Sequence, residues 1–467
     1  MHEALNRGGR HARSAGKNFS PAARRLEVTP HHPHINPHQW IILTLYRALF
    51  TAGVILFVIC FPLWIFNSKR QQTLFKRLGW QQYPRLQASR RSPVWVHAVS
   101  IGELLSAGSL IESLRRETGG ERPLYLSVST LSAFALATER FGRSCDGCFY
   151  FPYDVRFAVK RCLEKINPAL VVFIETDIWP GFLADVRRNA VPCLLVNGRL
   201  SPESFRTYRT VSALFKPAFN TFRSIYPQSQ GEADRFLALG IEPGRLRTPG
   251  NLKFDAAPPI PDDALLAALR KEFHILPDSP ILIAGSTHSG EEEILHSCFL
   301  RLRRKFPALR LILVPRNPGR GSEIVELFQG DGVHAALFSR LDRSTPVVVV
   351  DRLGYLSRLY ALADLAVIGG SFVPRGGQNP IEPAACGKPV LFGPDMHDFP
   401  DVSRWLLEAG GAIRANNEEE LYAACDRLLT DPEKAAEMGR HGRRVVTAHQ
   451  GTTARIVQDI VSILSAK

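Results

Sequence analysis

The chain has 467 residues, which is too long for one ordinary domain, so two or three domains with full cores are expected. Its formal net charge of +14 and isoelectric point near 9.6 favour acidic partners. Residues 1–39 carry six Arg or Lys against two Glu, and residues 67–91 carry seven and no acid. Neither cluster has the interleaved aromatic residues of an RNA-binding motif, which argues against nucleic acid as a partner. The Arg-, His- and Pro-rich residues 1–39 are predicted to form a disordered tail.

An apolar run of 19 residues without charge, 48–66, lies between the two basic clusters. It is long enough to span a membrane or lie buried in one. Pro62 would kink or end such a helix, and Trp64 suits a membrane interface. The run starts too late and is too long for a cleaved signal peptide. We therefore predict a membrane-anchor helix within residues 40–66, with the body of the protein in the cytoplasm and an anionic membrane surface as one partner.

The eight cysteines are scattered along the chain, and only Cys145 and Cys148 are close in sequence. No second pair and no His-x-His stands at a zinc spacing, which indicates reduced thiols of a cytosolic protein. No Asp-x-Asp occurs in a metal-binding context either. The sequence therefore predicts no metal site.

After the anchor, short apolar runs alternate with amphipathic helical stretches. The runs lack the polar alternation of half-exposed strands, which predicts buried parallel strands and an α/β fold. They are VWVHAV, LYLSVS, ALVVFIE and CLLVNG, then ILIAGS, LRLILVP, VVVVD, LAVIGGS and KPVLFGP. Pro-rich sequence between the two sets predicts a linker at 256–263 that joins two Rossmann-like, doubly wound domains, 67–255 and 264–445. A last helix within 446–467 is placed where it can cross back to the first domain.

Two turns in the two halves resemble each other. In the first half, the run VWVHAV ends at Ser100, and Glu103 follows at the spacing of a capping box. In the second half, IAGSTHSGEEE at 283–293 repeats the order of strand, small polar turn and helix start. Helix starts favour anions through their free amides and their dipole, so two facing binding surfaces are predicted. Glu103 is then either a cap or a carboxylate that faces a substrate.

The densest motif is the Gly-rich segment GGSFVPRGGQNPIEPAACGKPVLFGP, residues 369–394. Its glycines let the backbone approach a ligand closely. Asn379 is predicted to be the N-cap of the following helix, Pro380 its first residue and Glu382 its N3 acid. An ordinary capped helix is the alternative to a site in which Glu382 accepts from ribose hydroxyls while amides hold a phosphate. The segment VPRNPGR, after another predicted strand, offers Arg316 to phosphate.

Ten sequence runs together carry a resemblance to a known family. They are WVHAVSIGE, FPYD, ETDIWP, LVNGRLS, PQSQGEADRFLALG, GNLKFD, GSTHSGEEE, VPRNPGR, DRLGYL and GGSFVPRGGQNPIEPA. They resemble the Kdo transferases, the 3-deoxy-D-manno-octulosonate transferases of Gram-negative lipid A biosynthesis, over nearly everything from residue 40 onward. The resemblance implies a two-domain GT-B fold, an N-terminal anchor in the inner membrane and inverting transfer of Kdo from CMP-Kdo to a lipid A precursor (lipid IVA). No metal or other cofactor is expected.

The resemblance also implies roles for single residues. Glu103 matches the catalytic base, and Glu175 and Lys253 match residues that assist the transition state. Lys253 is expected to neutralise either the Kdo carboxylate or the leaving phosphate, and the sequence leaves both open. The matching CMP-binding positions are Arg316, Asn317, Gly354, Tyr355, Leu356, Asn379, Pro380, Ile381 and Glu382. Arg199 and Arg206 are candidates for contacts to acceptor phosphates, with solvated loop charges as the alternative.

Three positions depart from the usual family pattern. Gln378 and Asn317 stand where the family usually has His, and Asp177 stands where many relatives have Glu. Amide side chains hydrogen-bond but carry no proton at neutral pH, so affinity for CMP is expected to be weaker if either His acts by charge. A different GT-B transferase, a sugar-nucleotide epimerase and an inactive lipid-binding scaffold are the alternatives.

For the turn at Ser100 we make a specific prediction. Glu103 points toward the substrate, Ser100 caps the helix alone, and the helix dipole keeps the Glu103 carboxylate ionised. The number of Kdo residues transferred and the oligomeric state stay open.

Overall fold

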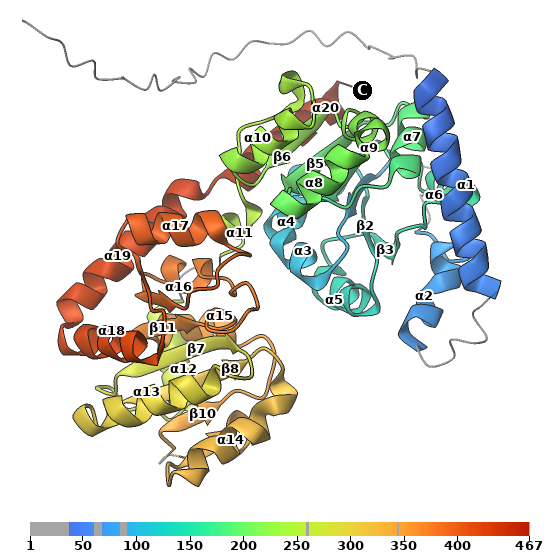
Figure 1. Cartoon of the computed structure of the whole chain (residues 1–467). Coiled ribbons are helices and arrows are strands. Elements are labelled where there is room, and N and C mark those ends of the chain that lie inside the picture. Colours follow the sequence, from blue (N-terminus) through green and yellow to red (C-terminus); the bar gives the residue numbers. More distant parts are fainter. Residues whose placement is uncertain (1–36, 60–67, 85–90, 258–260, 343–344, 467) are drawn as a thin grey trace, which may run out of the picture.

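The computed structural model describes residues 37–59, 68–84, 91–257, 261–342 and 345–466. The predicted tail therefore lies almost wholly outside the described residues, as do Pro62, Trp64 and part of the predicted linker. Figure 1 shows two domains, each a parallel sheet with helices packed on it. The prediction of an α/β fold with two doubly wound domains is confirmed.

The first domain has a six-stranded parallel sheet in the order β3-β2-β1-β4-β5-β6. Its strands are β1 (Val94–His97), β2 (Leu124–Val128), β3 (Gly147–Tyr150), β4 (Leu170–Ile174), β5 (Cys193–Gly198) and β6 (Ser224–Pro227). Alternate side chains of a strand point to opposite faces, so Val94 and Val96 enter one core and Trp95 enters the other. Because both faces are buried, the strands read as continuous apolar runs.

Helices cover both faces of this sheet. They are α3 (Ile101–Ser106), α4 (Gly108–Glu117), α5 (Leu131–Phe141), α6 (Arg156–Ile166), α7 (Pro180–Arg188), α8 (Pro202–Thr210), α9 (Ser212–Phe219), α10 (Gln230–Ala238) and, from the C-terminus, α20 (Thr452–Ser465). The short α2 (Ser68–Arg77) packs near β3. The short α11 (Leu252–Asp255) leads toward the second domain.

The second domain has a seven-stranded parallel sheet in the order β13-β12-β11-β7-β8-β10-β9. Its strands are β7 (Ile281–Thr287), β8 (Arg310–Pro315), β9 (Ala335–Leu337), β10 (Val347–Val349), β11 (Leu365–Ile368), β12 (Val390–Phe392) and β13 (Ala412–Arg414). Its helices are α12 (Asp263–Glu272), α13 (Glu292–Lys305), α14 (Gly321–Gly330), α15 (Leu356–Leu359), α16 (Ile381–Ala385), α17 (Pro400–Glu408), α18 (Glu418–Thr430) and α19 (Pro432–His449). Because all strands are parallel, the loops that follow β7, β8, β10 and β11 share one edge of the sheet.

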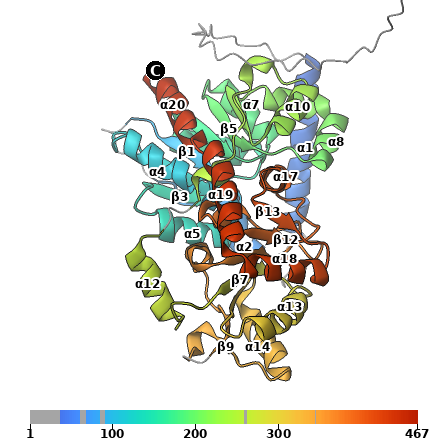
Figure 2. The ribbon, with the colours of Figure 1, turned by 90° about the vertical axis from the view of Figure 1, so that its left-hand side faces the viewer.

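The chain crosses between the domains twice, and the two crossings are bonded to each other. The Asp255 carboxylate accepts the N–H groups of Gly451 and Thr453, each at 2.6 Å. Beyond this point α20 packs against α4, and its Ile456 and Ile460 belong to the core of the first domain. Figure 2 shows α19 and α20 running from the second domain up to the first.

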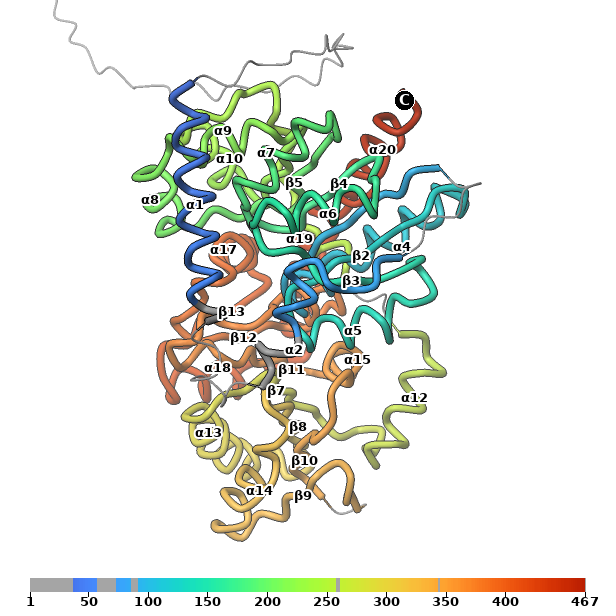
Figure 3. The backbone as a smooth tube through the Cα atoms, turned by 90° about the vertical axis from the view of Figure 1, so that its right-hand side faces the viewer, coloured from blue at the N-terminus to red at the C-terminus, as the bar shows by residue number. Residues whose placement is uncertain are grey.

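The N-terminal helix α1 (Pro37–Ile59) is docked on the first domain along α7 and α9 (Figure 3). The Tyr46 hydroxyl donates to Asp154 at 2.8 Å, and Arg47 forms an ion pair with Asp185 at 2.8 Å. Its outer side chains are more than half exposed: Trp40, Ile41, Leu45, Leu49, Ile55 and Leu56. Within the described residues, this is the one helix whose length and composition suit a membrane span. It begins at Pro37, three residues before the predicted start at residue 40, and the first domain pairs its Arg47 charge.

Candidate active site

The predicted catalytic residues and Arg199, a candidate for acceptor binding, lie beyond neighbouring strands at the carboxyl edge of the first sheet. Glu103 follows β1, Glu175 follows β4, and Arg199 follows β5, and these three strands are adjacent. Lys253 lies in α11, which follows β6. The charges of Glu103, Glu175 and Arg199 all act on the Lys253 ammonium, so the fold brings these four residues together.

The Glu103 carboxylate turns back onto the turn that precedes α3. It accepts the Val99 N–H at 2.7 Å and the Ser100 hydroxyl at 3.2 Å, while Ser100 Oγ accepts the Glu103 N–H at 3.4 Å. The prediction that Ser100 caps the helix alone is therefore wrong. A half-buried carboxylate needs hydrogen-bond donors. The Val99 N–H lies beyond the end of β1, and the Glu103 carboxylate is the acceptor for it.

The Glu103 carboxyl is also less acidic than expected from a helix start. Burial raises its pKa to about 7, and the nearby carboxylates of Glu175 and Asp177 also raise it, against the lowering by the Val99 and Ser100 donors. The prediction that the dipole keeps Glu103 ionised is corrected, because desolvation of the charged form outweighs a helix dipole at this position. The Glu103 carboxyl is therefore protonated in part of the molecules at pH 7.

The backbone at Glu175 is in the left-handed region, with φ of +59°, and so is the backbone at Asn197, also at +59°. Such backbone costs about 1 to 3 kcal/mol per residue and is concentrated at functional sites. The Asn197 side chain joins the two predicted catalytic segments. Its Nδ2 donates to Glu175 at 3.4 Å, and its Oδ1 accepts the Leu252 N–H at 3.0 Å, next to Lys253.

Lys253 is the predicted catalytic residue that contacts the second domain directly. Its Nζ lies 4.6 Å from the ring centroid of Phe399, in the loop before α17. The Asn251 side chain caps α11 by accepting the Lys253 N–H at 2.9 Å. Burial lowers the pKa of Lys253, and the carboxylate of Glu175 partly opposes this. The ammonium is therefore half-buried between the two domains.

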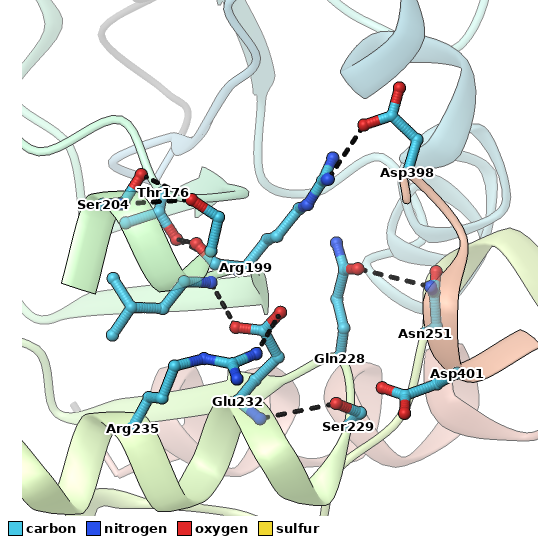
Figure 4. A network of polar contacts seen from close by, with 12 residues as sticks. Thr176, Arg199, Ser204, Gln228, Ser229, Glu232, Arg235, Asn251, Asp398 and Asp401 are labelled. Carbon is cyan, nitrogen blue, oxygen red and sulfur yellow. Dashed lines mark hydrogen bonds and ion pairs between the residues drawn. The ribbon is translucent and has the colours of Figure 1, made fainter. Parts of the chain in front are cut away.

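Arg199 forms an ion pair with Asp398 of the second domain, with 3.0 Å between Nη2 and Oδ1 (Figure 4). The backbone of Arg199 is fastened to Thr176, whose Oγ1 accepts the Arg199 N–H at 3.0 Å and whose hydroxyl donates to the Arg199 carbonyl. The next residue, Leu200, donates to Glu232. Arg199 thus has a protein partner at the domain boundary, while Arg206 lies exposed on α8.

The predicted CMP-binding residues gather at the carboxyl edge of the second sheet. Arg316 follows β8, Gly354 follows β10 with φ of +85°, and Asn379 follows β11. Asn379 Oδ1 accepts the Ile381 N–H at 3.1 Å, and its Nδ2 donates to Glu382 at 3.1 Å. Burial raises the pKa of Glu382.

Some details at this edge differ from the prediction. Helix α16 begins at Ile381, so Pro380 is its N-cap and not its first residue, because Asn379 binds the amide two residues on rather than three. Tyr355 packs on Phe338, with ring centroids 5.0 Å apart, and donates to Glu272 at 3.2 Å. Leu356 packs partly buried against the same core, so the hydrophobic side of this turn faces the domain.

Two of the three positions that depart from the family pattern, Asn317 and Gln378, are placed differently. Asn317 Oδ1 accepts the Gly319 N–H at 3.1 Å and caps the short 3₁₀ helix Pro318–Arg320. The Gln378 backbone N–H donates to the Gly369 carbonyl at 3.0 Å, which closes the Gly-rich loop. Asn317 is thus engaged in shaping its own turn.

Comparison with known proteins decides the family. The 3-deoxy-D-manno-octulosonic-acid transferase (kdotransferase) family matches residues 72–256. A 3-deoxy-D-manno-octulosonic acid transferase of Bordetella pertussis is 31% identical over 382 residues, covering 79% of this chain and 87% of that protein. The chain belongs to the Kdo transferase family. It is therefore a glycosyltransferase. A 3-deoxy-D-manno-octulosonic acid transferase of Haemophilus influenzae is 29% identical, and the match covers 86% of this chain and 94% of that protein.

Solved structures agree with this Kdo transferase in fold. A UDP-GlcNAc 2-epimerase from Neisseria meningitidis bound to UDP-GlcNAc superimposes with a TM-score of 0.54 at 13% identity, covering 80% of this chain and 100% of that one. The Anabaena protein HepE in complex with UDP and glucose has a TM-score of 0.54 at 16% identity, covering 81% of this chain and 100% of that one. The likeness extends over both domains, as expected for a GT-B fold.

Several residues of this Kdo transferase site were not singled out from the sequence. Buried His97 at the end of β1 stacks on Phe151 and lies 3.1 Å from Asp177, which also accepts the Trp179 indole N–H at 2.7 Å. In the second domain, burial lowers the pKa of His288. The quoted motifs WVHAVSIGE and GSTHSGEEE contain both histidines, but only the tertiary structure supplies their partners.

Proposed function

We propose that this Kdo transferase moves Kdo from CMP-Kdo to the lipid A precursor lipid IVA, with inversion at the anomeric carbon and Glu103 as general base. One observation carries the proposal. The half-buried Glu103 carboxyl, the Lys253 ammonium and the Glu175 carboxylate converge at the carboxyl edge of the first domain, where Lys253 contacts the second domain. The transfer of a sugar to a hydroxyl requires a base with a pKa near 7 and a partly desolvated cation.

In the proposed reaction, the Glu103 carboxylate accepts the proton of the acceptor hydroxyl while the hydroxyl oxygen attacks the anomeric carbon of Kdo. The bond from that carbon to the phosphate oxygen of CMP breaks on the opposite side, so the configuration inverts. CMP leaves with the bonding electron pair, and the positive charge of Arg316 or Lys253 stabilises it. Lys253 could equally neutralise the Kdo carboxylate. These cations belong to the chain, so we propose that the reaction needs no metal.

For the donor, we propose that CMP lies at the carboxyl edge of the second sheet. Arg316 and Asn317 would contact the phosphate, residues 354–356 the nucleotide, and segment 379–382 the ribose. Glu382 lies in the first turn of α16, and the hydrogen bond from Asn379 Nδ2 orients its carboxylate. A carboxylate can accept hydrogen bonds from both hydroxyls of a ribose.

The decisive experiment incubates the purified full chain with CMP-Kdo and lipid IVA and weighs the products by mass spectrometry. We expect a lipid product heavier by whole Kdo residues, and their number reads out how many are transferred. Dialysis against EDTA should leave the rate unchanged. A wild-type chain that forms no Kdo adduct, or that turns over only a UDP-sugar, would refute the proposal.

The pH dependence of the rate tests the base. Because Glu103 acts ionised and its pKa is about 7, kcat/KM should rise about tenfold per pH unit below pH 7 and level off above it. Asp177→Asn removes a neighbouring negative charge and lowers the pKa of Glu103. It should therefore shift this rise in kcat/KM, the acidic limb of the profile, to lower pH. Glu164→Gln, at an exposed carboxylate of α6, is the control and should leave it in place. A limb that Asp177→Asn does not move speaks against Glu103 as the base.

We also propose that the protein sits on the cytoplasmic face of the inner membrane. The exposed apolar side of α1 supports this, together with an aromatic patch formed by Phe75, Trp80 and Phe157. Its ring centroids are 6.3 and 5.9 Å apart, and each ring is more than half exposed. The exposed Lys76, Arg156 and Lys160, close in sequence to the aromatic patch, would meet anionic lipid.

Replacing all three patch residues by Ser should weaken binding of the full chain to anionic lipid vesicles by roughly tenfold or more, because each ring that enters lipid contributes about 1 kcal/mol. Co-sedimentation measures it. Leu276→Ser is the control, because Leu276 is 68% exposed but lies in the second domain. Equal binding by the two variants would show that the patch does not touch lipid.

A further inference from the structure

One buried carboxylate holds the Gly-rich loop of the second domain by backbone amides alone. Glu291, only 1% exposed, precedes α13. Its Oε1 accepts the N–H groups of Ser371 and Phe372, each at 2.9 Å. Its Oε2 accepts those of Gly370 at 2.6 Å and His288 at 2.9 Å. The carboxylate thus accepts four hydrogen bonds from backbone N–H groups, and such charge-assisted hydrogen bonds are strong.

Glu291 lies in the turn IAGSTHSGEEE and bears on the expectation for it in part. The sequence predicted amides left free for a ligand anion at this turn. Of the four amides that Glu291 binds, that of His288 belongs to this turn, and the other three belong to residues 370–372. Glu291 is thus an acceptor mainly for the Gly-rich loop.

The loop that Glu291 holds leads directly into the proposed donor site. Gly370 has φ of +68°, and its carbonyl accepts the Gly377 N–H at 2.8 Å. The Gly369 carbonyl accepts the Gln378 N–H at 3.0 Å. The start of the loop is thus bonded to its end, one residue before Asn379. A shift of residues 370–372 would be carried into the segment 379–382.

We propose that Glu291 is a positioning residue for donor binding: by gathering the amides of His288 and residues 370–372, it shapes the loop so that segment 379–382 can bind CMP. The inference rests on the proposed donor site. Glu291 itself does not touch the donor, because its two oxygens are turned onto four protein amides.

Glu291→Gln tests this. The amide side chain has one acceptor oxygen, and its NH₂ group would face two backbone N–H groups, so the loop must move. We expect the KM for CMP-Kdo, and the dissociation constant for CMP measured by calorimetry, to rise roughly 10- to 100-fold. The KM for the lipid acceptor should stay within about twofold. A merely structural defect would lower kcat through a smaller active fraction and leave both KM values unchanged.

Glu292→Gln is the matched control. Glu292 is also 1% exposed and stands at the same helix start, but its carboxylate binds Arg320, at 2.9 Å, and not the loop. Glu292→Gln should lower the melting temperature as much as Glu291→Gln does, but it should leave the KM for CMP-Kdo unchanged. If Glu291→Gln fails to fold, Glu291→Asp, which keeps the charge on a shorter side chain, should show a smaller rise in donor KM.

Glu382→Gln separates the two proposals. If it leaves CMP affinity unchanged, the proposed donor site is wrong. If it weakens CMP binding while Glu291→Gln and Glu291→Asp behave like Glu292→Gln, the donor site stands and the positioning role of Glu291 is refuted.

Discussion

Glu103→Gln lowers kcat by about 10²- to 10⁴-fold, the contribution of a general base. The amide keeps the volume of the side chain and can still accept the Val99 N–H, so the fold of the turn persists while proton acceptance is lost. Initial rates with CMP-Kdo and lipid IVA measure the effect, with the melting temperature recorded beside them.

Ser100→Ala is the control that separates the cap from the base. It removes a hydroxyl that both accepts the Glu103 N–H and donates to the carboxylate, and loss of such a cap costs about 1 kcal/mol of stability. We expect Ser100→Ala to lower the melting temperature while retaining most of kcat. Full activity of Glu103→Gln would exclude Glu103 as the base and leave the family assignment intact.

Lys253→Met lowers kcat by roughly 10²- to 10³-fold, because a preorganised charge at the reacting centre is lost. The melting temperature of Lys253→Met should stay unchanged or rise, because the half-buried ammonium costs desolvation free energy that Met does not. A fall in activity together with retained stability identifies a functional cation. Retained kcat in Lys253→Met would show that the charge takes no part in the reaction.

Two further variants refine the role of Lys253. Lys253→Arg should not restore the rate, because the planar guanidinium is larger and places its donors differently. Phe399→Leu removes only the ring that Lys253 Nζ faces at 4.6 Å, an interaction of about 0.5 to 2 kcal/mol, so it should cost far less kcat. If Lys253→Met raises the KM for CMP-Kdo as well, the ammonium binds the donor before the transition state.

One of the contacts between the domains at the proposed site is an ion pair. The Arg199–Asp398 pair is half-exposed, and such pairs contribute about 0 to 1 kcal/mol. Asp398 donates its backbone N–H to the Gly376 carbonyl at 2.9 Å, so its position follows the Gly-rich loop. The pair therefore links the acceptor-side loop at Arg199 to the donor-side loop without adding much stability.

Much of the architecture was predictable because its signals are local. Apolar runs without polar alternation mark strands buried on both faces, and all the quoted runs are strands. The Pro-rich segment separates the two sheets. The motifs that follow strands lie at the carboxyl edges, because parallel strands all end at the same edge of a sheet. The apolar anchor was predicted as a helix at 40–66, and the helix begins three residues earlier, at Pro37. The partner of its Arg47, Asp185, lies far along the chain and could not be predicted.

The sequence by itself determined the two-domain α/β class, the family and which strand ends carry polar residues, because these depend on local periodicity and motif identity. Only the tertiary structure decided how the side chains are used. Glu103 binds its own turn, Arg199 forms an ion pair with Asp398 at a sequence separation of 199 residues, and Glu291 holds a loop about 80 residues away. These contacts depend on desolvation and on partners distant in sequence, and no local pattern records either.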